Sequence, residues 1–240
     1  MKKITLTLVA LLGINAIVSA QETVTDTVVT TTTRTTTNFE RVRKDRFNFY
    51  YGFGVNVFGD YKLNDKLKAS NMPTIGTTAP EVTFGLNYMP SEDHFYHDLE
   101  FSVAYLDDKT SANRIKTAVT SFRIRPQYKF IDNKKMFFSA GIDGGVAVTI
   151  VNLYSRGNVI DLNNLDPAKH TGHITMNSTQ FILGPSVALA LFQDSFPIRI
   201  NTGYNFGLSR GRWKSDVADV HNAVKESGLG NFYAKLSIGF

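Results

Sequence analysis

The residues that could perform acid–base or metal chemistry are few and scattered. The chain has 240 residues, no cysteine and five histidines, which are His94, His97, His170, His173 and His221. His170 and His173 are three residues apart, a spacing that binds a metal only when rigid further ligands complete the site. Asp161 and Asp166 are the nearby candidates. All four lie in a segment without strand periodicity, so we expect a solvated loop and no metal site.

A serine and a histidine on one predicted strand do not form a catalytic pair either. Ser102 and His97 are five residues apart, so a strand places them on opposite faces and roughly 17 Å from each other. A chain without cysteine has no thiol nucleophile, no Cys-based zinc site and no disulfide. We therefore expect no enzymatic activity and no cofactor.

From Phe47 onward, apolar and polar residues alternate with a period of two. In FNFYYGFGVNVF (47–58), one face carries only Phe, Tyr and Val, while the other carries mainly Asn and Gly. Alternation of this kind predicts a strand, and no helical period competes with it. The segments that show it are 47–58, 81–89, 97–106, 118–130, 136–150, 179–192, 197–209 and 231–240.

The connections between these strands alternate in length. Residues 90–94, 131–135 and 193–196 are short connections, 107–113 is intermediate, and 59–79, 152–177 and 210–228 are long. Short turns at one end and long loops at the other are typical of outer-membrane barrels. We predict an all-β fold: a closed, antiparallel, up-and-down transmembrane β-barrel of eight strands, with short periplasmic turns and long extracellular loops. An extra hairpin inside 152–177 would make ten strands and stays an alternative.

The two faces distinguish a membrane barrel from a soluble one. A soluble ligand-binding barrel alternates in the same way but turns its apolar face inward. Here the apolar set is uniformly bulky, and the other set is rich in Gly, Ser, Ala and Asn. Because an eight-stranded barrel has a narrow interior, we predict that the small polar set lines the lumen and the bulky set faces lipid. A soluble periplasmic ligand-binding barrel is the third possibility for function.

The predicted inner face carries the best-defined group of charges. Its members are Asp98, Glu100, Arg123, Arg125, Asp143 and Arg199. Charges in a narrow lumen must be paired or hydrated, since leaving them otherwise costs several kcal/mol. We predict a salt-bridge network centred on Glu100 and Arg125 that plugs the lumen. The alternative is a narrow pore, with a gated path for small ions or a small ligand.

The N-terminal residues have the pattern of a secretory signal peptide over residues 1–20. Lys2 and Lys3 precede the apolar stretch 4–18, and small residues lead to cleavage near Ala20. Residues 21–46 include TVTDTVVTTTTRTTT, which predicts a disordered Thr-rich periplasmic segment. Its Asp26-Thr27-Val28 is similar to an O-glycosylation motif of Bacteroidota, and glycosylation stays open. The barrel then occupies residues 47–240.

The C-terminal strand carries a second signal. NFYAKLSIGF ends on Phe240, with Phe232, Leu236 and Ile238 on the same face. This resembles the assembly signal that the barrel-insertion machinery reads in bacterial outer-membrane barrels. Residues 47–240 as a whole resemble small eight-stranded outer-membrane barrels of the OmpA/OmpX type, especially those of Bacteroidota. Because the chain stops at its last strand, we expect no peptidoglycan-binding domain of the kind that the OmpA family carries.

The resemblance implies a monomer in the bacterial cell outer membrane, in contact with outer-membrane lipid and lipopolysaccharide. The formal net charge of +5 includes Lys2 and Lys3, so the exported chain is only weakly basic and we expect no nucleic-acid partner. In the last long loop, Arg212, Trp213 and Lys214 are a possible surface contact for sugars or acidic lipopolysaccharide groups. Anchoring of Trp213 at the membrane interface is the preferred interpretation. We expect a structural or surface-interaction role.

Overall fold

The computed structural model of this chain describes residues 46–90, 94–133, 135–156, 173–192 and 196–239. The predicted signal peptide, the Thr-rich segment up to residue 45, Asp161, Asp166, His170 and Phe240 lie outside these ranges. Within them, no helix is long and apolar enough to cross a membrane.

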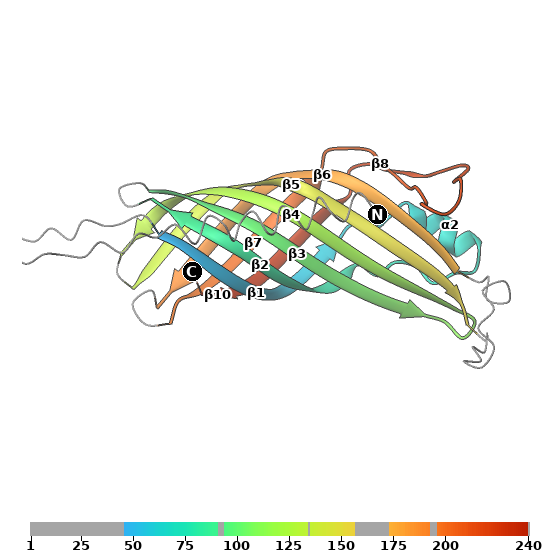
Figure 1. Cartoon of the computed structure of the whole chain (residues 1–240), viewed down its shortest axis with the longest axis horizontal. Coiled ribbons are helices and arrows are strands. Elements are labelled where there is room, and N and C mark those ends of the chain that lie inside the picture. The colour runs from blue at the N-terminus through green and yellow to red at the C-terminus, as the bar shows by residue number, and fades with distance from the viewer. Residues whose placement is uncertain (1–45, 91–93, 134, 157–172, 193–195, 240) are drawn as a thin grey trace, which may run out of the picture. The chain divides into compact units, whose positions relative to one another are not determined.

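Antiparallel strands make up most of the described chain (Figure 1). In order, the elements are β1 (Arg46–Phe58), α2 (Leu63–Ala69), β2 (Thr78–Met89), β3 (Phe95–Lys109), β4 (Asn113–Asp132), β5 (Met136–Ser155), β6 (His173–Leu191), β7 (Ile198–Gly207), β8 (Gly211–Arg212), β9 (Lys225–Glu226) and β10 (Gly230–Ile238). Bulky aromatic and β-branched residues at alternate positions favour extended backbone. Each barrel strand then pairs antiparallel with its neighbours.

Eight of these strands close into a barrel, in the order β1-β10-β7-β6-β5-β4-β3-β2. The barrel closes through β1, where Tyr51 lies opposite Phe84 of β2 on one side and Ile238 of β10 on the other. The predicted all-β, closed, antiparallel barrel of eight strands is thus confirmed. The ten-stranded alternative is wrong, because β5 pairs directly with β6 along almost its whole length.

The bulky apolar side chains of the strands face outward. Phe53 is 64% exposed and Phe181 60% exposed, whereas the intervening inner positions are buried, as the alternating burial along β2 and β3 shows. This is the orientation predicted from side-chain size, because only the smaller and polar set fits inside eight strands. It is the reverse of what a soluble barrel with an apolar interior requires.

Several strands are longer than their sequence pattern predicted. β4 and β5 have 20 residues each and β6 has 19, so they continue beyond the ends expected at 118, 150 and 179. The loop segments also have structure of their own: α2 lies between β1 and β2, and the β8–β9 hairpin lies between β7 and β10. Figure 1 shows α2 and β8 at one end of the barrel, which we call the mouth, and the C-terminus near the other.

Candidate functional site

Buried charges occupy the centre of the barrel. We call them the charged cluster, and its members are Glu81, Asp98, Glu100, Arg123, Arg125, Asp143, Arg199 and Lys235. They come from six strands, and their inward orientation follows from the two-residue period of each strand. Four carboxylates face four basic groups, so the charged cluster is formally neutral.

Arg125 on β4 holds one half of the charged cluster together. Its Nε lies 2.7 Å from Asp143 Oδ1, and its Nη1 lies 3.3 Å from Asp98 Oδ2. Arg199 reaches the same Asp98 carboxylate from β7, with Nη2 3.0 Å from Oδ2. Asn87 donates a further hydrogen bond of 2.5 Å to Asp98 Oδ1. The Asp98 and Asp143 carboxylates therefore each meet several donors, which is what a charge out of water requires.

Glu100 on β3 is the centre of the other half. Its Oε1 accepts from Arg123 Nη1 at 3.0 Å and from Lys235 Nζ, while Oε2 lies 3.4 Å from Arg125 Nη1. Arg123 Nη1 also lies 3.1 Å from Glu81 Oε1 on β2. The 3.4 Å contact between Glu100 and Arg125 joins the two halves into one network.

Two tyrosines complete the charged cluster, and two glycines make room for them. Tyr50 donates to Glu100 Oε2 at 3.1 Å, and Tyr233 donates to Asp143 Oδ2 while accepting from Arg125. A Cβ on Gly85 would lie 2.5 Å from the Tyr50 ring, and one on Gly203 would lie 2.7 Å from the Tyr233 hydroxyl. Glycine at these positions allows a large ring to cross a narrow lumen.

The structure brings all six predicted lumen charges into this network. It also adds Glu81 and Lys235, which the prediction did not include. The signal for both was in the sequence, because each lies on the polar face of an alternating strand. Their contacts form because β2, β3, β4 and β10 meet across the lumen. The alternation within a single strand does not predict which strands face each other.

The arrangement can neutralise charge and fix the strands in register, and the serine and histidine considered from the sequence lie on opposite faces of β3. Ser102 Oγ is 2.7 Å from Ser121 Oγ inside the barrel, whereas His97 is exposed on the outer face and stacks on Tyr88. The described ranges contain no group of three or more His, Asp or Glu residues that could hold a metal ion.

An apolar cluster fills the mouth of the barrel, and we call it the cap. Its buried members are Phe58, Tyr61, Leu63, Leu67, Ile75, Ala79, Ala104, Ile115, Val119, Val151, Leu153 and Trp213. They combine inward residues of the strands with residues of α2 and of the loops. The α2 helix turns Leu63, Asn64 and Leu67 inward, as the i, i+3/i+4 spacing of a short amphipathic helix allows.

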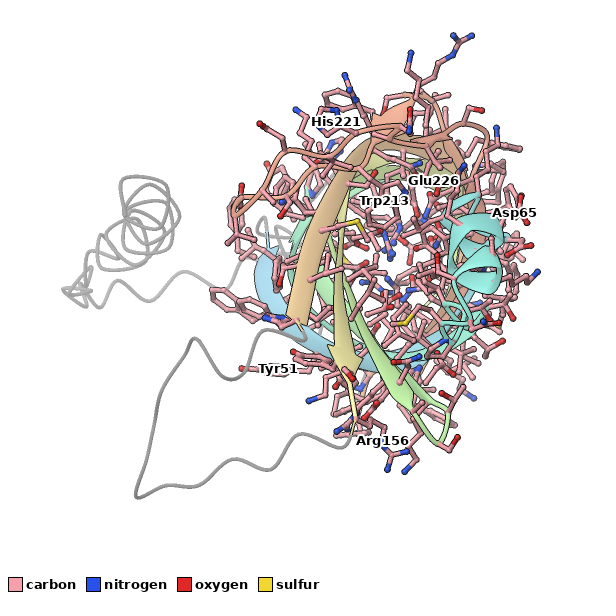
Figure 2. The ribbon with its side chains drawn as sticks, turned by 90° about the vertical axis from the view of Figure 1, so that its right-hand side faces the viewer. Tyr51, Asp65, Arg156, Trp213, His221 and Glu226 are labelled. Carbon is pink, nitrogen blue, oxygen red and sulfur yellow. The ribbon has the colours of Figure 1, made fainter. Side chains whose placement is uncertain are left out.

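One carboxylate ties the cap together. Glu226 on β9 accepts from the backbone N–H of Lys62 at 2.9 Å and of Leu63 at 3.0 Å, which are the otherwise unpaired donors at the start of α2. Its Oε1 also accepts from Trp213 Nε1 at 2.8 Å. Figure 2, which views the mouth, shows Trp213 and Glu226 close to each other and α2 beside them.

The expected surface role of Trp213 is wrong. Trp213 is 1% exposed and lies in the cap, while its neighbours Arg212 and Lys214 are exposed. The two-residue period continues past Gly211 into this loop, because β8 pairs with β9 and Lys214 bridges to Asn177. An alternation that places the two cations outside places the indole inside.

The remaining predicted positions lie on the outer face. Phe232 and Leu236 of β10 are exposed, and Ile238 is half-buried in the same row. Five tyrosines lie on the apolar faces of the predicted strands. Four of them are exposed, namely Tyr51, Tyr105, Tyr128 and Tyr204, and Tyr88 is half-buried. The outer face of the strands is thus apolar, while the interior carries the charged cluster at its centre and the cap at the mouth.

Comparisons with known proteins give similarity of fold only. No protein-family model and no curated protein matches the sequence. Among solved structures, the chain is similar to Ail, the attachment invasion locus protein of Yersinia pestis, with 12% identity over 82% of this chain and 99% of that one and a TM-score of 0.48. It is also similar to Neisserial surface protein A, with 9% identity over 82% and 99% and a TM-score of 0.44. A major outer membrane protein from Thermus thermophilus has 9% identity over 81% and 99%, with a TM-score of 0.46.

Proposed function

We propose that this chain is an integral protein of the bacterial outer membrane with a structural or surface-interaction role and a plugged lumen. The observation that carries the proposal is the apolar outer face. Large exposed side chains on it include Phe47, Phe49, Phe53, Phe84, Phe101, Phe122, Ile124, Ile142, Phe181, Leu183, Ile200, Phe206 and Leu236. Soluble monomers rarely expose apolar patches larger than a few hundred Å². A lipid bilayer is the solvent that such a belt requires.

The interior supports a plugged lumen over a pore. The charged cluster crosses the barrel from β2 and β3 to β7 and β10, with its carboxylates and cations in direct contact. Above it, the cap fills the mouth with apolar side chains. Water and ions would have to break buried ion pairs and then pass an apolar layer, and both steps are costly.

The partners follow from the same observations. We propose outer-membrane lipid and lipopolysaccharide as the surroundings of the belt, and the barrel-insertion machinery as the partner that reads the C-terminal strand. All barrel strands have two neighbours within one chain, so a single copy closes the sheet and a monomer suffices. The mouth, with its loops and α2, is the surface available for recognition, since strands are scaffold.

A charged substitution in the belt tests the membrane location. Phe101→Arg places a cation on the outer face of β3 and should cost about 2–4 kcal/mol in a bilayer. We expect the wild type in the outer-membrane fraction, with SDS-gel mobility that changes on boiling, and a loss of both for Phe101→Arg. The matched control is Val217→Arg, because Val217 is an 80% exposed apolar residue in the loop between β8 and β9.

Two other results would contradict parts of the proposal. If wild type and Phe101→Arg were both soluble periplasmic proteins with no heat-dependent shift, the membrane assignment would be wrong. The same purified wild type placed in planar bilayers should give no steady conductance. Steady conductance that Glu100→Ala altered would replace the plugged lumen by a narrow pore while leaving the outer-membrane location intact.

A further inference from the structure

A basic pocket lies on the outer side of the barrel at the edge of the mouth, which we call the rim. The pocket is separate from the charged cluster and from the cap. We call it the rim pocket, and it is lined by Arg114, Lys116, Tyr154, Ser155 and Arg156 from the upper ends of β4 and β5. It is open and has a volume of about 270 Å³. Figure 2 shows Arg156 at the edge of the mouth, on another side from Trp213 and from Asp65 of α2. The volume suits a small charged group rather than a drug-sized ligand.

The positive charge of the rim pocket is only partly compensated. Arg114 forms two hydrogen bonds with Asp107, one from Nε at 2.7 Å and one from Nη2. Arg156 Nη1 donates to the Thr110 carbonyl oxygen at 2.5 Å. Among the described residues, neither Lys116 nor Arg156 forms an ion pair with a carboxylate. Lys116 Nζ instead lies 5.7 Å from the centre of the Tyr154 ring. Two cations therefore remain available to an anion.

Strand register places these cations directly beyond the apolar belt. Tyr105, Ala118 and Ile150 lie side by side on the outer face of β3, β4 and β5. The next outward row toward the mouth contains Asp107, Lys116 and Asn152, and the row after it contains Lys109, Arg114 and Tyr154. Successive outward rows are about 7 Å apart along the strands. The outer face thus changes from apolar to polar within one row, and the row after that is basic.

We propose that the rim pocket binds the phosphate of a glycolipid headgroup in the outer leaflet, a proposal that rests on the outer-membrane location proposed above. The Arg156 guanidinium and the Lys116 ammonium supply the charge, and Ser155 supplies a hydroxyl donor. Arg114, fixed by Asp107, adds a cation of defined position. Guanidinium groups match the geometry of phosphate oxygens, and long cationic side chains reach from an apolar surface to the headgroup level. Because Lys116 lies one row beyond the apolar outer face, the phosphate nearest to it in a bilayer would be that of a lipid headgroup.

Removal of the two unpaired cations tests the proposal. Lys116→Gln/Arg156→Gln removes two positive charges from the rim pocket. Lys66→Gln/Lys68→Gln is the matched control, since it removes two exposed positive charges from α2 at the same end of the barrel. The probe is bisphosphorylated lipid A in detergent micelles, with phosphatidylcholine micelles as the reference lipid. Heat-dependent gel mobility and Trp213 emission verify that both variants are folded.

We expect wild type to bind lipid A more tightly than phosphatidylcholine. The rim variant should lose about tenfold in affinity, because charge-assisted bonds to phosphate are strong, whereas the control should stay within about twofold. Equal binding of the two lipids by wild type, or an equal loss in the two variants, would overturn the proposal. Saturable binding of inorganic pyrophosphate that excludes lipid A would assign the pocket to a free phosphate compound instead. Because binding is measured in micelles, failure here is distinct from a failure of membrane fractionation.

Discussion

The charged cluster and the cap fill the same barrel with opposite chemistry. The charged cluster is made only of side chains on barrel strands, so the hydrogen-bonded ladder fixes the position of every partner. Five of the twelve buried members of the cap come from α2 and from loop segments, and its apolar contacts are not directional. The centre of the barrel therefore depends on strand register, whereas the mouth depends on loops that can loosen while the barrel stays closed.

Substitution of Arg125 should destabilise the charged cluster and, with it, the barrel. Arg125→Gln leaves Asp98, Asp143 and Glu100 short of their shared cation. Removal of one partner from a buried ion pair typically costs about 3–5 kcal/mol, and we expect that loss in the free energy of unfolding. Urea unfolding of the refolded barrel in detergent measures it.

The matched control for Arg125→Gln is Arg114→Gln. Arg114 makes a similar bidentate contact with Asp107, but both side chains are partly solvent-exposed. Exposed ion pairs contribute little, so the unfolding midpoint of this variant should stay near that of wild type. Equal midpoints for wild type and Arg125→Gln would show that the charged cluster does not hold the barrel.

Truncation of Leu67 should open the mouth alone. Leu67 is 4% exposed in the cap, and a buried Leu→Ala change costs roughly 2–3 kcal/mol at a site that can partly collapse. We expect red-shifted emission from Trp213, the only tryptophan, while the heat-dependent gel shift is unchanged. Lys66→Ala, on the exposed side of the same helix, should leave the emission as in wild type. A loss of the gel shift in Leu67→Ala would mean that mouth and barrel are one cooperative unit.

The smallest effect concerns Tyr61 and appears at high pH. Burial in the cap raises the pKa of Tyr61 to about 12, and the Glu226 carboxylate adds to the rise against the Thr149 hydrogen bond. A raised pKa means that the contribution to stability is complete below the unfolded value near 10 and is lost as the pH rises through 12. The cap should therefore loosen between these values.

Trp213 reports on this titration, because its ring centre lies 6.3 Å from that of Tyr61. We expect a change in Trp213 emission with a midpoint near pH 12 in wild type and its absence in Tyr61→Phe. At neutral pH, Tyr61→Phe loses only the 3.4 Å hydrogen bond to Thr149, worth about 0.5–1.5 kcal/mol. Identical curves for the two proteins would show that another group controls the mouth.

The fold could be predicted because alternation and side-chain size both act within single strands. Phe53 against Gly52 and Gly54 already indicates which face fits a narrow interior. The upper ends of β4, β5 and β6 were missed because residues such as Lys116, Asn152 and Thr175 are polar on the outer face there. Alternation between apolar and polar residues fades where a strand leaves the belt, although its hydrogen-bonded ladder continues.

The candidate site was predictable only in part, for a related reason. The six predicted charges could be assigned to a face from sequence, but Lys235 meets Glu100 across a separation of 135 residues, which only the closed barrel defines. Trp213 was misplaced because two flanking cations resembled an interfacial anchor, while its true partner, Glu226, lies 13 residues further along the chain.

The position of Tyr233 and Lys235 on β10 has a consequence for the order in which the barrel assembles. Until the last strand docks between β1 and β7, Glu100 lacks Lys235, and the Arg125–Asp143 pair lacks the Tyr233 hydroxyl. Before closure, Glu100, Arg125 and Asp143 would lie next to a water-filled gap between β1 and β7, and Lys235 would be missing from the charged cluster. The charged cluster becomes neutral only on closure. The contacts of Lys235 and Tyr233 then form together and stabilise the closed state. Docking of β10 therefore closes the sheet and completes the charged cluster in the same step.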